Sequence, residues 1–316
     1  MAISVFKTSS LAQRLPKYKK MWSPSVGKVG TWGAYSFPSS ADVRQIVSNG
    51  TTRAVGCSYS DSVWWYTADG ITWTTIPTKP LGALSVCWTG SQFAAVDYAN
   101  TTWTQSVDGT TWLSGSLSGT TPASVAGIAY GNSVYVLGGR GGTPSYSSDG
   151  KAWTAASGAS TSDPRFTFGN GIFMMVEANS STSYWTSTNG STWTSRTCPS
   201  SASLGFASFA NGKFFFHSST ASTTTYYYST DAINWTAGTL PASQVWVGVA
   251  YANGVYVAVG TGGSATSYDG ITWSSLSGPS ISASTGWQPV VLSNSILAAN
   301  GSGGSTGAKY LPITLG

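Results

Sequence analysis

Few side chains in this sequence could act as an acid, a base or a charged ligand group. The 316 residues include ten Asp and Glu residues, of which one is Glu, and a single histidine. Acid–base catalysis usually needs paired carboxylates or an imidazole, so this composition argues against an enzyme. Outside the repeats described below, the candidates for a ligand-binding site are Asp97, Tyr98, Arg140, Asp163, Arg165, Glu177 and His217.

Glycan chemistry is the activity that these residues and the many aromatic rings suggest. Hydrolysis by an ordinary glycosidase needs two carboxylates about 5–9 Å apart, for which Asp97, Asp163 and Glu177 are the candidates. Glycan binding needs no titratable group, because aromatic rings can stack on sugars; packing inside the fold is the competing role for those rings. The aromatic residues concerned are Trp64, Trp65, Tyr98, Trp103, Tyr184, Trp185 and Tyr226 to Tyr228.

The three cysteines carry no metal or disulfide signal. Cys57, Cys87 and Cys198 are odd in number and lack CxxC spacing. We expect them to be small buried hydrophobic residues. The sequence predicts no metal site and no cofactor.

The composition favours an all-β fold. Hydrophobic residues make up 41% of the chain, enough for a sizeable core, whereas charged residues make up 8%. Long exposed helices are built from charged residues, whereas the 38 Gly, 15 Trp and 16 Tyr favour short strands and tight turns.

A box of the form Ser/Thr-x-Asp-Gly-x-x-Trp recurs six times. Its tryptophans are separated by 39, 41, 40, 42 and 38 residues, which is the period of a four-stranded propeller blade. Asn189 replaces the aspartate of the fourth box and Ala232 the glycine of the fifth, so we expect looser turns there. The Asp and Trp positions are Asp69 and Trp73, Asp108 and Trp112, Asp149 and Trp153, Asn189 and Trp193, Asp231 and Trp235, and Asp269 and Trp273.

A second repeated signal is a turn flanked by apolar runs. Seven such turns are centred near residues 49, 90, 132, 170, 211, 253 and 294. Several contain Asn-Gly, which favours a two-residue hairpin because both central residues of a type I′ turn need positive φ. Each repeat therefore contains strand A, this turn, strand B, a loop, strand C, the box and a short strand D.

Seven hairpins and six boxes leave one strand D missing. Counting 41 residues back from Trp73 reaches Trp32, whose segment Val29-Gly30-Thr31-Trp32 resembles the end of a box without its Asp. We predict that residues near 29–34 supply strand D of the last repeat, whose other strands come from about 285–310. The predicted fold is a seven-bladed β-propeller of four-stranded antiparallel blades, closed so that no sheet edge stays free.

The box resembles the Asp-box (BNR-like) repeat of sialidases and of many non-enzymatic β-propellers, over about 280 residues. The resemblance implies that each Asp holds the turn between strands C and D and that each Trp packs between blades. The Asp and Trp residues of the boxes are therefore expected to be structural. Sialidase chemistry fits poorly, because that family uses an arginine cluster, a Tyr activated by a Glu and an Asp acid on a six-bladed ring.

Irregular loops are the expected place for function. In a propeller the A–B and C–D turns lie on one face, and the B–C and D–A loops lie on the other. The seven candidate residues fall on or beside the loops of the second face, which we predict to be the ligand face; a solvated rim without a ligand is the alternative.

Residues 1–28 form a separate basic arm before the propeller of residues 29–316. The arm has six cationic residues and no acid, whereas the rest of the chain has nine cations and ten acids. Pro16 would interrupt a helix, so we expect an extended segment that docks on a partner protein; nucleic-acid binding, for which no motif exists, and a disordered tail are the alternatives. The docking candidates are Phe6, Lys7, Leu11, Arg14, Leu15, Lys17, Tyr18, Lys19, Lys20 and Trp22.

The composition resembles the style of structural proteins in tailed bacteriophages. No signal-peptide core and no stretch of about 18 apolar residues is present, so we predict no membrane insertion. Our hypothesis is a non-enzymatic virion protein of a tail, fibre or capsid decoration, assembled in the host cytoplasm. The arm would anchor it to other virion proteins and the propeller would bind host surface glycans. The alternatives are a free lectin-like propeller and a glycoside hydrolase.

Overall fold

The structure is a computed structural model. It describes residues 27–37, 43–58, 63–78, 80, 82–178, 182–200, 204–218, 222–278, 288–300 and 307–315. All ten docking candidates of the arm lie outside these ranges, so partner docking by the arm stays a prediction.

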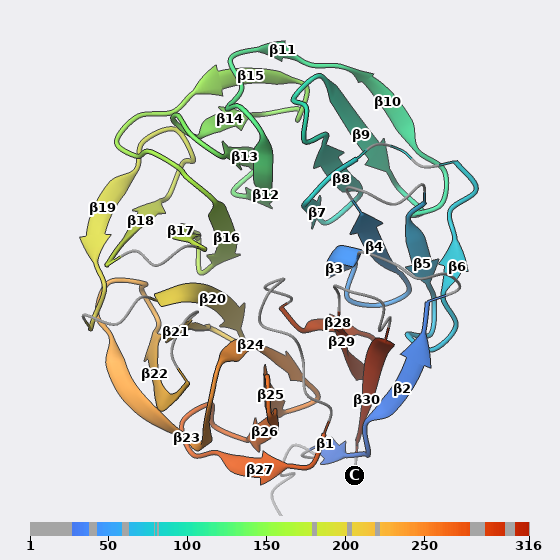
Figure 1. The fold of residues 1–316 in the computed structure, drawn as a ribbon, viewed down its shortest axis with the longest axis vertical. Helices are drawn as coiled ribbons and strands as arrows, with labels where there is room; N and C mark the ends of the chain where they lie inside the picture. The colour runs from blue at the N-terminus through green and yellow to red at the C-terminus, as the bar shows by residue number, and fades with distance from the viewer. Residues whose placement is uncertain are drawn as a thin grey trace, which may run out of the picture.

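The described strands form seven sheets arranged in a ring, with strand A of each blade innermost and strand D outermost (Figure 1). The predicted seven-bladed β-propeller is thereby confirmed. No helix, and so no helix able to span a membrane, occurs in the described ranges.

Blade 1 contains β3 (Val43–Ser48), β4 (Ala54–Ser58), β5 (Trp65–Thr67) and β6 (Thr74–Thr75). Blade 2 contains β7 (Val86–Trp88), β8 (Phe93–Val96), β9 (Thr102–Ser106) and β10 (Leu113–Ser116). Blade 3 contains β12 (Val125–Gly131), β13 (Val134–Gly139), β14 (Ser145–Ser147) and β15 (Ala152–Ala155).

The remaining blades repeat this order of four antiparallel strands. Blade 4 contains β16 (Pro164–Gly169), β17 (Ile172–Glu177), β18 (Ser183–Ser187) and β19 (Thr194–Thr197). Blade 5 contains β20 (Leu204–Ala210), β21 (Lys213–Ser218), β22 (Thr223–Ser229) and β23 (Thr236–Gln244). Blade 6 contains β24 (Trp246–Ala252), β25 (Val255–Gly260), β26 (Gly263–Ser267) and β27 (Ser274–Leu276). Blade 7 contains β28 (Val290–Leu292), β29 (Ser295–Asn300), β30 (Gly307–Leu315), β1 (Gly27–Val29) and β2 (Gly33–Ser36). A two-residue strand, β11 (Ser118–Gly119), adds a parallel edge to blade 3, which the sequence did not predict.

Blade 7 is closed by the N-terminal segment, as predicted from the spacing of Trp32. Strand D is divided into β1 and β2, and both pair with β30. The interruption lies opposite Pro312, since a Cβ on Gly30 would lie 2.6 Å from the Pro312 ring. Gly27 and Lys28, predicted to belong to the arm, are already part of β1.

The asparagines of the A–B turns link neighbouring blades. In blades 4, 5 and 6 both residues of the Asn-Gly pair have positive φ, as expected for type I′ turns. Asn170 Nδ2 also donates to the carbonyls of Gly212 and Thr230 in blade 5, at 3.0 and 2.9 Å. Asn132 makes the same pair of bonds from blade 3 to blade 4. Asn49 differs, because its side chain caps its own longer turn.

Replacing Asn170 with Gly isolates this link, because Gly adopts the φ of +47° without strain. We expect a loss of about 1–2 kcal/mol of unfolding free energy from two hydrogen bonds. Urea denaturation measures it. The control is Ser133→Gly, at an exposed residue with φ +62° and no such link, which should be neutral or slightly stabilising. Equal effects of the two substitutions would contradict the linking role.

The box turns share one hydrogen-bond pattern. In the sixth box Asp269 Oδ1 accepts from the backbone N–H groups of Ile271 and Thr272 at 2.7 and 2.8 Å, and the Ser267 hydroxyl donates to the same oxygen. Asn189 makes the equivalent backbone bonds at 3.0 Å each, so the fourth box keeps the same pattern. Ala232 keeps the left-handed conformation of the glycine it replaces, with φ +54°.

Acid should weaken the box turns. The backbone N–H groups of Thr272 and Ile271 lower the pKa of Asp269 to about 2 from 3.8. A lowered folded-state pKa means that this carboxylate contributes its full stability above about pH 4 and loses it as the pH falls toward 2. Asp269→Asn, which the natural Asn189 box imitates, should therefore be less stable than wild type at neutral pH, with the difference shrinking between pH 4 and 2. Thermal melts across this range test it, and a constant difference would contradict it.

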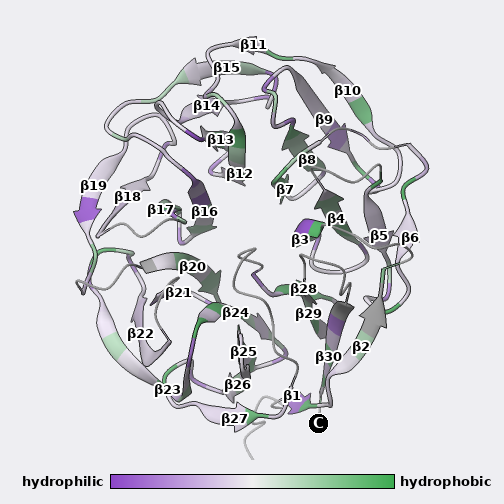
Figure 2. Cartoon of the chain, viewed as in Figure 1, coloured by the Kyte–Doolittle hydropathy of each residue, from purple (hydrophilic) through white to green (hydrophobic). Residues whose placement is uncertain are grey.

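The hydrophobic core lies between and within the blades rather than at one centre. Figure 2 shows hydrophobic residues on inner strands such as β4 and β8 and a hydrophilic residue on the outer strand β19. Trp235 and Trp273 donate their indole N–H groups at 2.9 Å to Tyr184 and Tyr226 of the preceding blades, as expected for tryptophans that pack between blades. All three cysteines are buried and free, and burial raises the pKa of Cys57 and Cys87 to about 12.

Candidate functional site

A polar pocket lies at the axis of the ring, where the first strands of several blades begin. Its volume is about 170 Å³, and its walls come from blades 1, 2, 3, 4 and 7. Arg140 directly follows β13, which is strand B of blade 3. The pocket therefore lies on the face of the B–C and D–A loops, which was predicted to bind ligand. We call it the axial pocket; its lining residues are Arg44, Gln45, Leu84, Ser85, Ala126, Gly127, Ile128, Arg140, Asp163, Pro164, Arg165, Phe166 and Gln288.

Arg44 reaches the axial pocket from a β-bulge. The register of β3 and β4 shifts between Val43 and Gln45, which leaves Arg44 as the extra residue. Similar shifts occur at the start of β12, β20 and β24. Bulges redirect side chains, and of the four extra residues, Arg44 is the charged one.

Side-chain hydrogen bonds connect blades 1, 2 and 3 at the pocket wall. Gln45 Oε1 accepts from the Ser85 hydroxyl and from the Val86 N–H, both at 2.9 Å. Ser85 Oγ in turn accepts from the Ile128 N–H at 3.2 Å. Gln45 is thereby held in place by its side-chain oxygen.

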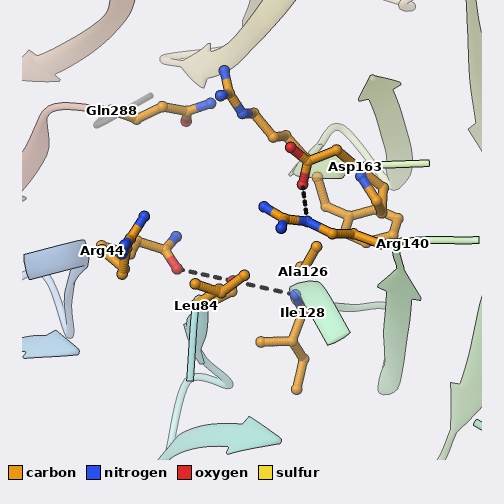
Figure 3. Close-up of a pocket in the computed structure, with 13 residues that line it drawn as sticks. Arg44, Leu84, Ala126, Ile128, Arg140, Asp163 and Gln288 are labelled. Carbon is orange, nitrogen blue, oxygen red and sulfur yellow. Dashed lines mark hydrogen bonds and ion pairs between the residues drawn. The ribbon is translucent and has the colours of Figure 1, made fainter. Parts of the chain in front are cut away.

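Arg140 and Asp163 meet across two blades. Arg140 Nε lies 3.4 Å from Asp163 Oδ1, and Figure 3 shows the Arg140 guanidinium directed toward the space between Arg44 and Gln288. The guanidinium also lies 5.9 Å from the ring centre of Tyr98. A hydrogen bond with Ser124, and then the positive charge of Arg140, lower the pKa of Tyr98.

Arg165 closes one side of the axial pocket. Its Nη1 donates to the Gly205 carbonyl at 3.3 Å, and its guanidinium lies 4.5 Å from the ring centre of Phe206. Burial lowers the pKa of Arg165, and the negative charge of Asp163 opposes that change. The Asp163 carboxylate thus lies beside two positively charged side chains, Arg140 and Arg165.

Glu177 lies behind the pocket and holds the loop that presents Asp163. Its Oε2 accepts from the N–H groups of Ser162 and Asp163 at 3.1 and 2.6 Å and from the Ser162 hydroxyl at 2.7 Å. The side chain is 5% exposed. Glu177 therefore positions Asp163 instead of contacting a ligand itself.

Glu177→Ala should destabilise the protein by about 2–4 kcal/mol, because three donors lose their acceptor in a buried place. Chemical denaturation measures this loss. Asp97→Ala is the control, because its carboxylate serves a more exposed loop, and it should cost about 1 kcal/mol. A Glu177 variant as stable as the wild type would show that this loop holds Asp163 without the carboxylate.

Four of the seven predicted site residues do not line the axial pocket: Tyr98 and Glu177 lie beside residues that do, whereas Asp97 and His217 are engaged elsewhere. The Asp97 carboxylate accepts from the N–H groups of Thr101 and Thr102 and from the Thr101 hydroxyl, all within its own loop. His217 is 1% exposed and stacks on Tyr226, and burial lowers its pKa to about 3.

The aromatic candidates Trp64, Trp65, Tyr184 and Tyr226 are buried, so these four rings pack inside the fold and do not offer stacking surfaces. Within the described ranges, no three His, Cys, Asp or Glu side chains are close enough to hold a metal ion.

Comparison with known proteins found solved structures of similar fold. No protein-family model and no curated protein matches the chain. A structure described as YCF48 bound to D1 peptide covers 92% of this chain and 99% of its own, with 16% identity and a TM-score of 0.67. Virginiamycin B lyase from Staphylococcus aureus covers 89% and 99%, with 11% identity and a TM-score of 0.72. The WD40 β-propeller domain of Doa1 covers 88% and 97%, with 15% identity and a TM-score of 0.56.

The shared property is the β-propeller fold. At these identities the likeness shows the fold alone, and the similar structures include both a lyase and a peptide-bound protein. The role of this propeller must therefore be argued from its own axial pocket.

The axial pocket also contains residues that sequence reasoning missed. Arg44, Gln45, Ser85 and Gln288 line it beside the predicted Arg140, Asp163 and Arg165. Arg44 and Gln45 lie at the start of strand A of blade 1, and Ser85 directly precedes strand A of blade 2. In the sequence, such positions are marked by the start of the apolar run before each hairpin turn. A search of those positions for polar residues would have found Arg44 and Gln45.

Proposed function

We propose that this propeller is a non-catalytic recognition protein of a bacteriophage particle. In this proposal the axial pocket faces host surface glycans, and the segment before β1 attaches the ring to another virion protein. The observation that carries the proposal is a difference in position between the side chains that could act as acids or bases and the arginines. Asp97, Glu177 and His217, on which catalysis would depend, are engaged or buried within the fold, whereas Arg44, Arg140 and Arg165 line the axial pocket.

Two further observations support a recognition role. The boxes have the hydrogen-bond pattern expected of Asp-box turns, a repeat that also occurs in non-enzymatic propellers, and their carboxylates are used by backbone N–H groups. The similar YCF48 structure contains a bound D1 peptide, so a protein partner is a reasonable role for a propeller of this shape.

Phage assembly in the presence of the full chain or of a chain lacking residues 1–26 tests the proposal. We expect the full chain to copurify with particles and the shortened chain to stay in the soluble fraction, while both bind host cells. Incorporation of the shortened chain would contradict anchoring by the arm. Host-cell binding by a chain that never joins particles would favour the free lectin-like alternative, and release of sugar from the bound glycan would favour a glycoside hydrolase.

A further inference from the structure

We infer that the outer edge of blade 2 binds an extended, uncharged segment of a partner protein, which joins the sheet as a further strand. This edge consists of the end of the second box and β10. The inference goes beyond the proposed function, which gives this edge no role. It belongs to the general mode of recognition in which a peptide adds a strand to an open sheet edge.

The chain itself shows what occupies the same edge in blade 3. There the linker that arrives from blade 2 forms β11, which pairs in parallel with β15. The Ser118 N–H donates to the Lys151 carbonyl at 3.0 Å, and the Thr120 N–H donates to the Trp153 carbonyl at 2.8 Å. The outer edge of a blade can therefore accept one more extended segment.

Blade 4 repeats this contact with the linker that arrives from blade 3. The Ser157 N–H donates to the Ser191 carbonyl at 2.9 Å, and the Trp193 N–H donates to the Ser157 carbonyl at 2.9 Å. In both linkers a glycine follows the serine, and Gly119 and Gly158 have φ of +83° and +82°. A Cβ on either glycine would collide with the carbonyl oxygen of the edge tryptophan. A Ser-Gly pair is thus the common feature of the two segments that dock.

The linker that arrives at blade 2 has different residues at these positions. Ile76 donates its N–H to the residue directly before strand C, as Leu117 does in the linker to blade 3, so the two linkers can be aligned. Pro77 therefore takes the place of Ser118. Proline has no N–H, so it cannot make the hydrogen bond that Ser118 makes.

Thr78 takes the place of Gly119, and a β-branched residue disfavours positive φ. No backbone hydrogen bond joins the described part of this linker to the edge of blade 2. A groove of about 370 Å³ lies between them instead, with Pro77 and Pro80 on one side and Trp112 on the other. None of the described residues that line the groove is charged, so it suits an uncharged segment.

Exposed apolar side chains accompany this edge. Of the large hydrophobic side chains that the structure describes, the two most exposed are Val107 and Leu113 of blade 2, at 73% and 71%. The equivalent residues of blade 3, whose edge is covered, are Ser148 and Thr154. An added strand has side chains on both faces of the sheet, so it would cover Leu113 as well as enter the groove.

NMR titration of the isotope-labelled full chain with a capped peptide of residues 115–121, which contains the Ser-Gly pair, tests the inference. At millimolar peptide the amide signals of Thr111 and Trp112 should shift saturably. The same peptide with Ser118→Pro should bind at least about fivefold more weakly, because it lacks one donor. Leu113→Thr in the protein, which copies blade 3, should weaken binding about threefold or more.

Pro77→Ser combined with Thr78→Gly gives the linker the residues that dock on blade 3. The linker should then cover the edge itself and abolish peptide binding, with a melting temperature no lower than that of the wild type. The matched control is Pro199→Ser combined with Ser200→Gly, the same kind of change in the linker to blade 5, which should leave the Kd measured at Trp112 unchanged.

Three results would each overturn the inference. They are absence of shifts at Thr111 and Trp112, equal binding of the two peptides, and undiminished binding to a stable Pro77→Ser, Thr78→Gly variant. The comparison of the two peptides uses the wild-type chain, so it decides the outcome even if that variant folds poorly.

Discussion

Removing residues 1–37 will prevent the ring from folding cooperatively, whereas removing residues 1–26 will leave its melting temperature nearly unchanged. The longer deletion removes β1 and β2, which form three and four register pairs with β30. It also removes Phe37, which is 4% exposed and packs against Trp65 and Trp73 of blade 1. Loss of a buried Phe side chain alone costs about 3–5 kcal/mol, a large part of a typical stability of about 5–15 kcal/mol.

The same short segment contacts three blades, so its loss opens the ring at one place. Trp32 donates its indole N–H to Ser264 of blade 6 at 2.9 Å, and the Gly27 N–H donates to the Asn253 carbonyl of the same blade. Without them β30 becomes an exposed edge strand, which favours aggregation. Calorimetry and size-exclusion chromatography of the two deletions provide the test. Similar melting temperatures for both would show that blade 7 is stable with three strands.

Gly70→Ala will destabilise the protein by about 3–4 kcal/mol, which combines the left-handed backbone and a steric clash. Gly70 has φ +78°, and a Cβ there would lie 2.5 Å from Leu297 Cδ2 and 2.8 Å from Tyr310 Cδ2. Both neighbours belong to blade 7, so the added methyl group would separate the first and last blades.

Gly90→Ala is the control for backbone strain, since Gly90 has φ +92° but no atom within 4 Å of the added Cβ. It should cost about 1–2 kcal/mol. Urea denaturation of both variants gives the difference, which is the cost of the clash. Equal losses would mean that the seam between blades 1 and 7 adapts to the methyl group.

The sequence was sufficient to predict the blades because their signals are local and repeated. The box spacing and the Asn-Gly turns gave the strand order, and the position of Trp32 predicted the closure of the ring. The second role of the asparagines was not predictable, because the Asn170 side chain bonds to carbonyls 42 and 60 residues away. Ala232 was expected to loosen its turn, yet its methyl group is buried in the core and the left-handed conformation is retained.

The candidate site was predictable in part. Loop position suggested Arg140, Asp163 and Arg165, but no periodic signal connects residues that meet on the axis from different blades. Arg44 depends on a bulge in β3, which one extra residue creates without a sequence signature. The support of Asp163 by Glu177 depends on the burial of that carboxylate, which composition does not reveal.

The pairing of Gly27 with Leu315 places the two ends of the propeller side by side. A short linker could therefore join them, and the chain could be reopened in a loop such as the one containing Gly141 and Gly142, where added side chains would meet nothing within 4 Å. Such circular permutants would place a fusion partner on either face of the ring. The propeller is thus a scaffold in which a different blade can come first along the gene while the cyclic order of the blades in space is kept.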